Sequence, residues 1–291
     1  MYGLLCVCFV LSDLASRFLA LLKTPSLTPR PYGLTHLIAL ALTVLLVYFL
    51  WTRRRDASDS QVRRTVRLVW LVMLVLELYK QVVFSFHLSP KGIVFAYEWG
   101  AFPFQLCSTP LYVLPLVAFL PEGRLRQSLL SYSASYALVG GLAVLLYPAS
   151  VFTDVLGINL QTMLHHLLQC VIGVYLGMRY RRELSWRHFL LGTLPFLSFL
   201  SIAVWLNEWV HRYLVGVGSD AHFNLFFVSP YYDGPLDFVN TWQGRMPPTL
   251  FVLLYALGLT LAAALVFFAV RRAALALETK KSRSERIPLC Y

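Results

Sequence analysis

The chain has few charged residues, and this shortage decides its class. Only 13% of its 291 residues are Asp, Glu, Lys or Arg, whereas a soluble domain contains about a quarter. Apolar and aromatic residues make up 58%, and the mean hydropathy is +0.65. This composition excludes a soluble globular domain and a solvated coil, and indicates a protein whose solvent is lipid.

Other features are also absent. The sequence contains no internal repeat, no low-complexity tract and no soluble domain, and its 5 cysteines have no repeated spacing that would indicate a disulfide framework. Neither HExxH nor CxxC occurs, so we expect no metal and no cofactor. The weak alternative is a zinc ion held by His166, Cys170 and Cys107.

Apolar runs are the dominant feature that is present. A helix needs about 20 residues to cross the hydrocarbon, and such runs occupy residues 34–51, 66–86, 102–120, 128–147, 160–178, 188–206 and 248–270. We therefore predict an all-α, polytopic membrane bundle of seven spans forming a single domain, with a long loop at 207–247 and a basic tail at 271–291. Residues 1–22 are predicted to form an amphipathic interfacial helix, the alternative being an eighth, poorly inserted span.

Basic residues set the expected orientation. The chain has 25 Lys and Arg against 14 Asp and Glu, a net charge of +11 that is compatible with either nucleic-acid binding or the positive-inside bias of membrane proteins. Most of the arginines follow the first, third, fifth and seventh runs, on one side of an alternating arrangement. This distribution predicts an outside N-terminus, a cytoplasmic C-terminus and no nucleic-acid partner.

Polar side chains inside the predicted spans converge on one depth. Cys107 and the pair His165 and His166 lie about five residues below the outer ends of their runs, and polar residues of the second run lie at a similar depth. Such residues are costly in hydrocarbon and are candidates for function. We expect one polar pocket in the outer half of the membrane.

A cysteine and a histidine at one depth are the minimum for acyl chemistry through a thioester. Each residue also has a structural interpretation: the cysteine as a small packing residue and the histidine as a hydrogen-bonding strut. Pro110 kinks its run and frees backbone groups, which either form an oxyanion site or only bend the helix. Glu77 and Lys80, three residues apart, either neutralise each other or bind a zwitterionic headgroup.

Several short segments carry a resemblance to a known family. They are FPFQLC at 102–107, QTMLHHLLQCVIGVYL at 161–176, and Asn207 followed by AHFNLFFVSP at 221–230. With these segments the chain resembles the YwaF-like integral membrane family, which includes transmembrane protein 164. One departure is Gln105, where many relatives are expected to have histidine.

The resemblance implies a helix bundle related to membrane lipid hydrolases, with a cysteine acyltransferase activity on phospholipid acyl chains. It implies Cys107 as nucleophile, His165 or His166 as base, and structural or headgroup contacts from Asn207 and Asn224. We therefore expect a lipid-acyl enzyme that acts on a phospholipid or lysophospholipid in the bilayer, with the substrate-binding candidates Glu77, Lys80, Gln81, Gln105, Gln169, Asn207 and Asn224. The alternative is a solute transporter or ligand-binding membrane protein that uses the same polar pocket.

Overall fold

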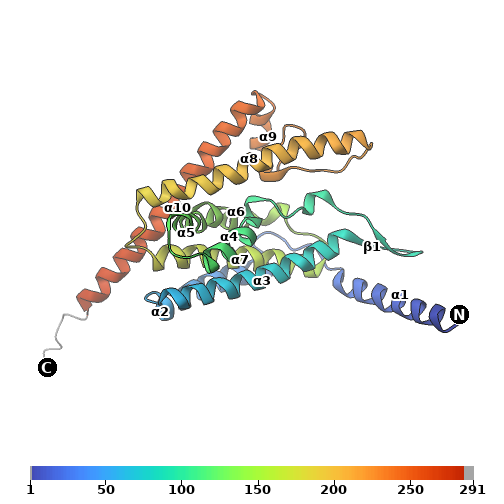
Figure 1. The fold of residues 1–291 in the computed structure, drawn as a ribbon, viewed down its shortest axis with the longest axis horizontal. Coiled ribbons are helices and arrows are strands. Elements are labelled where there is room, and N and C mark those ends of the chain that lie inside the picture. The colour runs from blue at the N-terminus through green and yellow to red at the C-terminus, as the bar shows by residue number, and fades with distance from the viewer. Residues whose placement is uncertain (1, 285–291) are drawn as a thin grey trace.

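The fold is a bundle of helices with one short hairpin. The computed structural model describes residues 2–284, and describes side chains for residues 12–237 and 239–279. Most of the long helices run along one axis, whereas the C-terminal helix crosses obliquely (Figure 1). The predicted all-α class is confirmed.

The long helices are α2 (Leu34–Arg54), α3 (Asp59–Ser85), α7 (Leu156–Arg179), α8 (Trp186–Gly216) and α10 (Pro248–Ser284). A further long helix is built from α5 (Arg124–Tyr132), the π-helix η3 (Ser133–Ala137) and α6 (Leu138–Leu146). Within the described residues, five helices are long and apolar enough to cross a membrane, namely α2, α3, the α5–α6 helix, α8 and α10. The chain is therefore an integral, multi-pass membrane protein.

Two of the seven predicted spans differ from these five. The run at 102–120 contains only η2 (Leu106–Ser108) and α4 (Pro110–Phe119), and the 10 residues of α4 are too few to cross the hydrocarbon. The run at 160–178 forms part of α7, which has 24 residues but carries several polar side chains that lower its hydropathy. The exact count of seven is not confirmed.

Prolines explain why the third run is broken. Pro110 takes the first position of α4, where a helix does not use the backbone N–H that proline lacks. The preceding residues, from Phe102, follow the short helix η1 (Trp99–Ala101) and stay irregular except for η2. Cys107 lies in η2, so the candidate nucleophile is on an irregular segment rather than inside a regular span.

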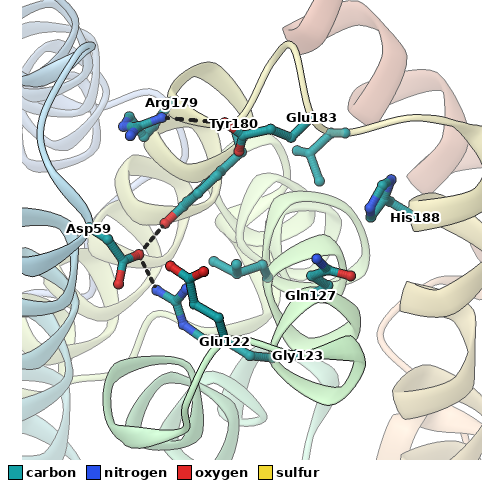
Figure 2. A pocket seen from close by; sticks show the side chains of 11 residues that line it. Asp59, Glu122, Gly123, Gln127, Arg179, Tyr180, Glu183 and His188 are labelled. Carbon is teal, nitrogen blue, oxygen red and sulfur yellow. Dashed lines mark hydrogen bonds and ion pairs between the residues drawn. The ribbon is translucent and has the colours of Figure 1, made fainter.

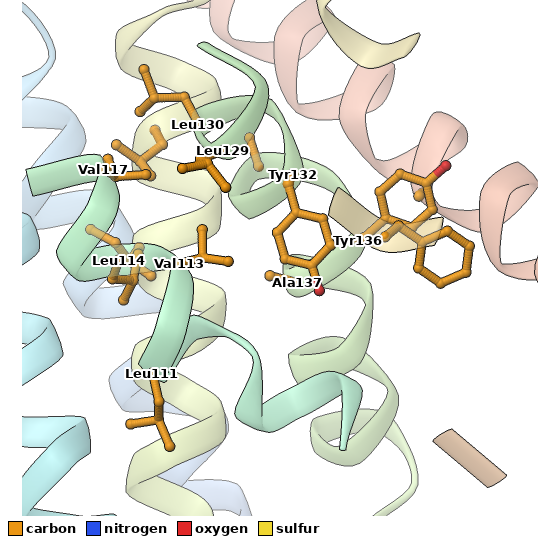
Figure 3. Packing of buried hydrophobic residues seen from close by; sticks show 14 of the residues in the cluster. Leu111, Val113, Leu114, Val117, Leu129, Leu130, Tyr132, Tyr136 and Ala137 are labelled. Atoms are coloured by element: carbon orange, nitrogen blue, oxygen red, sulfur yellow. The ribbon is translucent and has the colours of Figure 1, made fainter. Parts of the chain in front are cut away.

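The main core lies where α4, α5 and η3 pack together (Figure 3). Val113, Leu114 and Tyr132 are among its fully buried side chains. Helix α8 approaches this region closely at Gly192. A Cβ atom added to that residue would lie only 2.9 Å from the backbone nitrogen of Tyr132. This packing fixes the α5–α6 helix against the broken segment.

Ion pairs join the loops at one end of the bundle. Asp59 at the start of α3 contacts Arg63 at 2.5 Å, Arg126 of α5 at 2.7 Å and the Tyr180 hydroxyl at 2.9 Å. Tyr180 reaches toward Asp59 across a cavity of about 300 Å³ (Figure 2). The loops after α2, α4 and α7 therefore lie together, as the distribution of basic residues predicts, and we call this the basic end.

Arg181 extends the basic end to the last helix. Its guanidinium contacts Asp56 at 3.3 Å and Glu278 of α10 at 3.0 Å. Lys280, Lys281, Arg283 and Arg286 of the basic tail lie outside the residues whose side chains are described.

The opposite end carries the strands β1 (Phe86–Ser89) and β2 (Gly92–Phe95), and we call it the hairpin end. Helix α1 (Tyr2–Leu22) projects from the bundle beside this hairpin (Figure 1). Asp13 and Arg17, four residues apart on this helix, form an ion pair at 2.9 Å. An interfacial position for this helix is not confirmed.

The long loop predicted at 207–247 is partly wrong. Helix α8 continues to Gly216, because Val210 and Leu214 give the segment a buried apolar face. The remainder contains η5 (Leu225–Phe227) and α9 (Asp237–Gln243), and a short helix η4 (Pro148–Ser150) precedes α7. Asn207 therefore lies inside a helix rather than at the end of a span.

Candidate functional site

Cys107 is the middle residue of the short helix η2, just before α4. Its residue is partly exposed, whereas the following Ser108 and Thr109 are buried. The Thr109 hydroxyl is 2.7 Å from the carbonyl oxygen of Leu106 and 2.6 Å from the Tyr132 hydroxyl of α5. These bonds fix the backbone around the cysteine.

His165 of α7 contacts the same cysteine. Its Nε2 atom is 3.0 Å from the carbonyl oxygen of Cys107. Because a carbonyl oxygen only accepts, Nε2 carries the proton, and in a neutral imidazole Nδ1 is then an acceptor. That Nδ1 atom is buried without a hydrogen-bond partner among the described residues.

His166 is arranged in a similar way. Its Nδ1 atom donates to the carbonyl oxygen of Thr162 at 2.7 Å, so Nε2 is the acceptor atom of the neutral ring. This Nε2 atom also is buried with no partner in the described part of the chain. Both histidines are thus buried, with ring centroids 5.4 Å apart. Neither ring is hydrogen-bonded to the Cys107 thiol in the described residues.

Gln169 lies one turn further along α7 and is 1% exposed. Its Nε2 atom donates to the carbonyl oxygen of Ala137 at 2.6 Å, while its Oε1 atom has no partner among the described side chains. Gly140 and Gly141 of α6 allow this close approach, because added Cβ atoms would lie 3.3 Å from Gln169 Nε2 and 3.1 Å from Gln169 Cγ respectively. The amide is therefore fixed against α6.

The polar residues of α3 form a connected group. Lys80 Nζ is 2.9 Å from Glu77 Oε1, as the spacing predicts, and Gln81 Nε2 donates to the same oxygen at 2.6 Å. Gln81 Oε1 accepts from the Tyr97 hydroxyl at 3.0 Å. Burial, reinforced by Glu77, raises the pKa of Tyr97 to about 12, so this residue remains a hydrogen-bond donor at neutral pH.

This group of α3 lies beside the histidine residues of α7. Lys80 lines the same cavity as Thr162, whose carbonyl oxygen accepts from the His166 ring, and His165 in turn contacts the Cys107 carbonyl oxygen. The sequence-predicted residues of α3, η2 and α7 therefore meet in one cluster.

Gln105 and Asn207 have a different role. Gln105 donates to the carbonyl oxygen of Asn224 at 2.7 Å and accepts from the backbone nitrogen of Phe226 at 2.7 Å. Asn207 binds both backbone groups of Leu225, at 3.0 and 2.8 Å. The segment so held contains two consecutive residues in the left-handed region, Phe226 and Phe227, each with φ 54°.

Asn224 also binds backbone. Its Nδ2 atom donates to the carbonyl oxygen of Tyr232 at 2.8 Å, and its Oδ1 atom accepts from Ser229 at 2.9 Å. Gln105 therefore fastens the segment after α8 to the cysteine-bearing segment, Asn207 fastens it to α8, and Asn224 holds it together internally. The three amides are used in these structural bonds.

A cavity of about 830 Å³ opens at the hairpin end. Lys80 and Thr162 line it together with His87, Tyr97, Glu98 and Trp99. Cys107 and the two histidines do not line this cavity, but the Thr162 carbonyl that orients His166 belongs to a lining residue. The cavity thus reaches the cluster at Lys80 and is separated from the His166 ring by Thr162.

Comparison with known proteins adds the family. The model of the TMEM164 family matches residues 31–270, which include every candidate site residue. The chain belongs to the TMEM164 family. No curated protein and no solved structure gives a significant match.

Some residues of this TMEM164-family site were not predicted from the sequence. Thr109 and Tyr132 support the cysteine segment, and Gly140 lets α6 approach it. The pair of glycines at 140 and 141 within an apolar run is the signal that indicates close helix packing. Among the described residues, no group of three or more His, Cys, Asp or Glu side chains is arranged to hold a metal ion.

Proposed function

We propose that this TMEM164-family chain is a membrane-embedded lipid-acyl enzyme that forms a thioester on Cys107. The observation that carries the proposal is the contact of His165 with the Cys107 residue, with an unpartnered acceptor nitrogen left on the same ring. A base of this kind must be unprotonated and must lie next to the nucleophile. His165 meets both requirements more directly than His166, which contacts Thr162 instead.

In the first step, His165 takes the thiol proton and the Cys107 sulfur attacks the ester carbonyl carbon of a phospholipid acyl chain. An S–C bond forms, and the tetrahedral intermediate carries its negative charge on the former carbonyl oxygen. The C–O bond to glycerol then breaks, and the imidazolium returns the proton to the leaving glycerol oxygen. The products are a lysophospholipid and an acyl thioester.

In the second step, the hydroxyl group of water or of another lysophospholipid attacks the thioester carbonyl. The imidazole accepts the hydroxyl proton, the S–C bond breaks, and the proton returns to sulfur. We assign Lys80 a supporting role in both steps, because a cation in the same cluster favours the thiolate form that is the nucleophile. We assign the cavity at the hairpin end, which Lys80 lines, to the lipid headgroup.

The proposed chemistry takes place in the outer half of the membrane. We propose seven crossings, counting α7 and the broken segment with α4, with α1 on the outer interface and the C-terminus in the cytoplasm. The gathering of basic loops at one end of the bundle supports this arrangement, because such loops remain cytoplasmic.

The cavity also favours a second candidate, the binding of a polar solute. Its lining contains Lys80, His87 and Glu98, a mixture of charges that suits a zwitterion. A solute-binding protein would use Glu77 and Lys80 but would have no need of the Cys107 thiol. Substitution of Cys107 therefore distinguishes the two candidate functions.

The test is acyl turnover by purified protein in lipid nanodiscs that contain a phospholipid with a labelled acyl chain. We expect labelled acyl product from the wild type, an acyl label on Cys107 that neutral hydroxylamine removes, and neither from Cys107→Ala. Cys170→Ala is the matched control, because Cys170 is a buried cysteine on α7 that packs against Gly141. Wild-type turnover in Cys107→Ala would overturn the proposal in favour of solute binding.

A further inference from the structure

The peptide groups on the two sides of Cys107 are fixed by different helices. The carbonyl oxygen of Leu106, which belongs to the peptide group before the cysteine, accepts from the Thr109 hydroxyl at 2.7 Å. The carbonyl oxygen of Cys107, which belongs to the peptide group after it, lies 3.0 Å from Nε2 of His165 on α7. Because peptide groups are planar, fixing both of them also fixes the direction of the Cα–Cβ bond that carries the sulfur.

The Thr109 hydroxyl is itself held by Tyr132, the last residue of α5. The two hydroxyl oxygens are 2.6 Å apart. A hydroxyl has one hydrogen, and that of Thr109 is donated to the Leu106 carbonyl, so the Tyr132 hydroxyl is the donor to Thr109. Two hydroxyl groups thus connect α5 to the peptide group before the cysteine, and we call them the hydroxyl relay.

The hydroxyl relay is buried in an otherwise apolar core. Tyr132 and Thr109 are both 0% exposed, and the tyrosine belongs to the main core cluster. Thr109 alone is sufficient to bond the Leu106 carbonyl, and a phenylalanine at position 132 would fill the same space without burying a second hydroxyl. The tyrosine hydroxyl therefore serves to orient Thr109 rather than to fill the core.

The ring that carries this hydroxyl is held by two neighbours. The Tyr136 ring stacks on it, with centroids 6.0 Å apart and an interplanar angle of 12°, and Phe199 of α8 packs against it at 5.7 Å. Figure 3 shows both tyrosine rings within the core. The position of the Tyr132 hydroxyl is therefore set by two helices that do not carry the cysteine.

The π-helix η3 begins directly after Tyr132 and links the cysteine segment to α7. Tyr132 precedes η3 and contacts the cysteine segment, whereas Ala137 at the end of η3 accepts from Gln169 at 2.6 Å. Gln169 lies one turn beyond His165 on α7. Single π-helical turns occur frequently at functional sites. This irregular turn thus holds the segment of the proposed nucleophile at a fixed distance from the helix of the proposed base.

We propose that Tyr132 is a positioning residue, which acts through Thr109 to hold the Cys107 thiol in the orientation in which His165 takes its proton. This assignment rests on the proposed thioester chemistry. Tyr132 does not touch the reacting atoms or line the cavity assigned to the headgroup. Its loss therefore slows the attack of the thiol and leaves the binding of the lipid unchanged, which is a fall in kcat without a change in KM.

The experiment measures kcat and KM for release of a labelled acyl chain by purified full-length protein in lipid nanodiscs. In Tyr132→Phe, which keeps the ring and loses the donor, we expect kcat to fall about 10- to 100-fold, as when a reacting group is slightly misplaced. KM should stay within about twofold of the wild-type value. Thr109→Val should show the same loss, whereas Thr109→Ser keeps the hydroxyl and should restore kcat.

The double variant Tyr132→Phe with Thr109→Val tests whether the tyrosine acts through the threonine. Its kcat should be no lower than that of either single variant, because the same relay is broken in all three proteins. Losses that multiply would show that Tyr132 acts by another route, and they overturn the assignment.

Tyr136→Phe is the matched control. It also removes a buried tyrosine hydroxyl that contacts threonines, Thr193 at 2.9 Å and Thr260 at 3.2 Å, but these lie on α8 and α10 rather than beside the cysteine. The two phenylalanine variants should therefore lose a similar amount of thermal stability, whereas kcat should fall only in Tyr132→Phe.

An equal fall of kcat in the two phenylalanine variants overturns the assignment, because Tyr132 would then only stabilise the fold. Wild-type kcat in folded Tyr132→Phe, or a change confined to KM, also overturns it. If Tyr132→Phe does not fold, the comparison of Thr109→Val with Thr109→Ser decides by the same criteria. Turnover that persists in Cys107→Ala overturns the proposed function itself, and that result is distinct from all of these.

Discussion

The Nε2 atom of His165 lies 3.0 Å from the carbonyl oxygen of Cys107, so the imidazole is attached to the main chain of the cysteine rather than to its sulfur. This bond fixes the tautomer of the ring and presents Nδ1 as the acceptor atom. His166 is fixed through its other nitrogen, which donates to Thr162. The two neighbouring histidines therefore differ in the nitrogen that is left as acceptor, which is Nδ1 in His165 and Nε2 in His166.

This difference allows each histidine to be tested with its structural bond preserved. In His165→Gln the amide nitrogen replaces Nε2 and keeps the bond to Cys107, while the basic Nδ1 is lost. We expect folded protein whose acyl turnover is lower by about 10² or more, the usual contribution of a general base. The measurement is the turnover number on a labelled phospholipid.

The matched control is His166→Asn, in which the amide nitrogen replaces Nδ1 and keeps the bond to Thr162. Turnover in this variant should remain close to that of the wild type. The opposite pattern, with loss only in His166→Asn, would move the role of base to His166.

Much of this cluster could be predicted from the sequence. The depth of Cys107, His165 and His166 in their apolar runs placed them together correctly, and the three-residue spacing of Glu77 and Lys80 predicted their ion pair. These predictions hold because the spacing of residues on a helix and their depth in a span can each be read from a single stretch of sequence.

The rest depends on contacts between segments. Composition alone made 102–120 look like a span, although Pro110 starts a new helix there. Asn207 looked like a helix end, yet α8 continues past it because Val210 and Leu214 are buried by partners that the local sequence does not reveal. The nearness of Gly140 to Gln169 and Cys107 likewise arises from three segments that meet only in the fold.

The gathering of loops at the basic end predicts their location in the cell. Reporter fusions after Arg55, Arg126, Arg182 and Arg272 should all read cytoplasmic, because short basic loops remain inside. A fusion at Lys91, in the turn between β1 and β2, should read external. One external reading among the four basic positions would contradict the proposed crossings.

Gly192 of α8 packs directly against the α5–α6 helix. We therefore predict that adding one methyl group at this position lowers the stability of the protein. In Gly192→Ala the added Cβ meets backbone atoms of Ser131 and Tyr132 at 2.9–3.0 Å, which cannot move aside as a side-chain end can. We expect a loss of about 1–3 kcal/mol in the free energy of unfolding, typical of overpacking. The melting temperature in one fixed detergent measures it.

The control for that substitution is Gly258→Ala in α10, where an added Cβ meets nothing within 4 Å. Alanine is the better helix former by about 0.5–1 kcal/mol, so this variant should be as stable as the wild type or slightly more stable. Equal melting temperatures for the two alanine variants would show that α8 does not approach Tyr132 so closely.

The ion pair of Glu77 and Lys80 predicts that the two residues depend on each other. Glu77 is 5% exposed, and Lys80 Nζ lies 2.9 Å from its carboxylate. In Lys80→Leu the buried carboxylate retains, among the described residues, only the amide of Gln81, and in Glu77→Leu the ammonium loses its counter-ion. Lys80→Leu should lose about 3–5 kcal/mol of stability, the usual result of leaving a buried charge unpaired. Glu77→Leu should lose less, because Lys80 lines the cavity at the hairpin end.

The double variant Glu77→Leu with Lys80→Leu removes both charges and should be more stable than either single variant. Its acyl turnover should nevertheless stay low, because the cluster then lacks the Lys80 cation to which we assign stabilisation of the thiolate. Melting temperature and turnover, measured on the same four proteins, separate the structural part of the pair from its electrostatic part. If the single variants lose stability independently and their effects add, the two residues are not coupled, and the cluster around Cys107 is held without their mutual attraction.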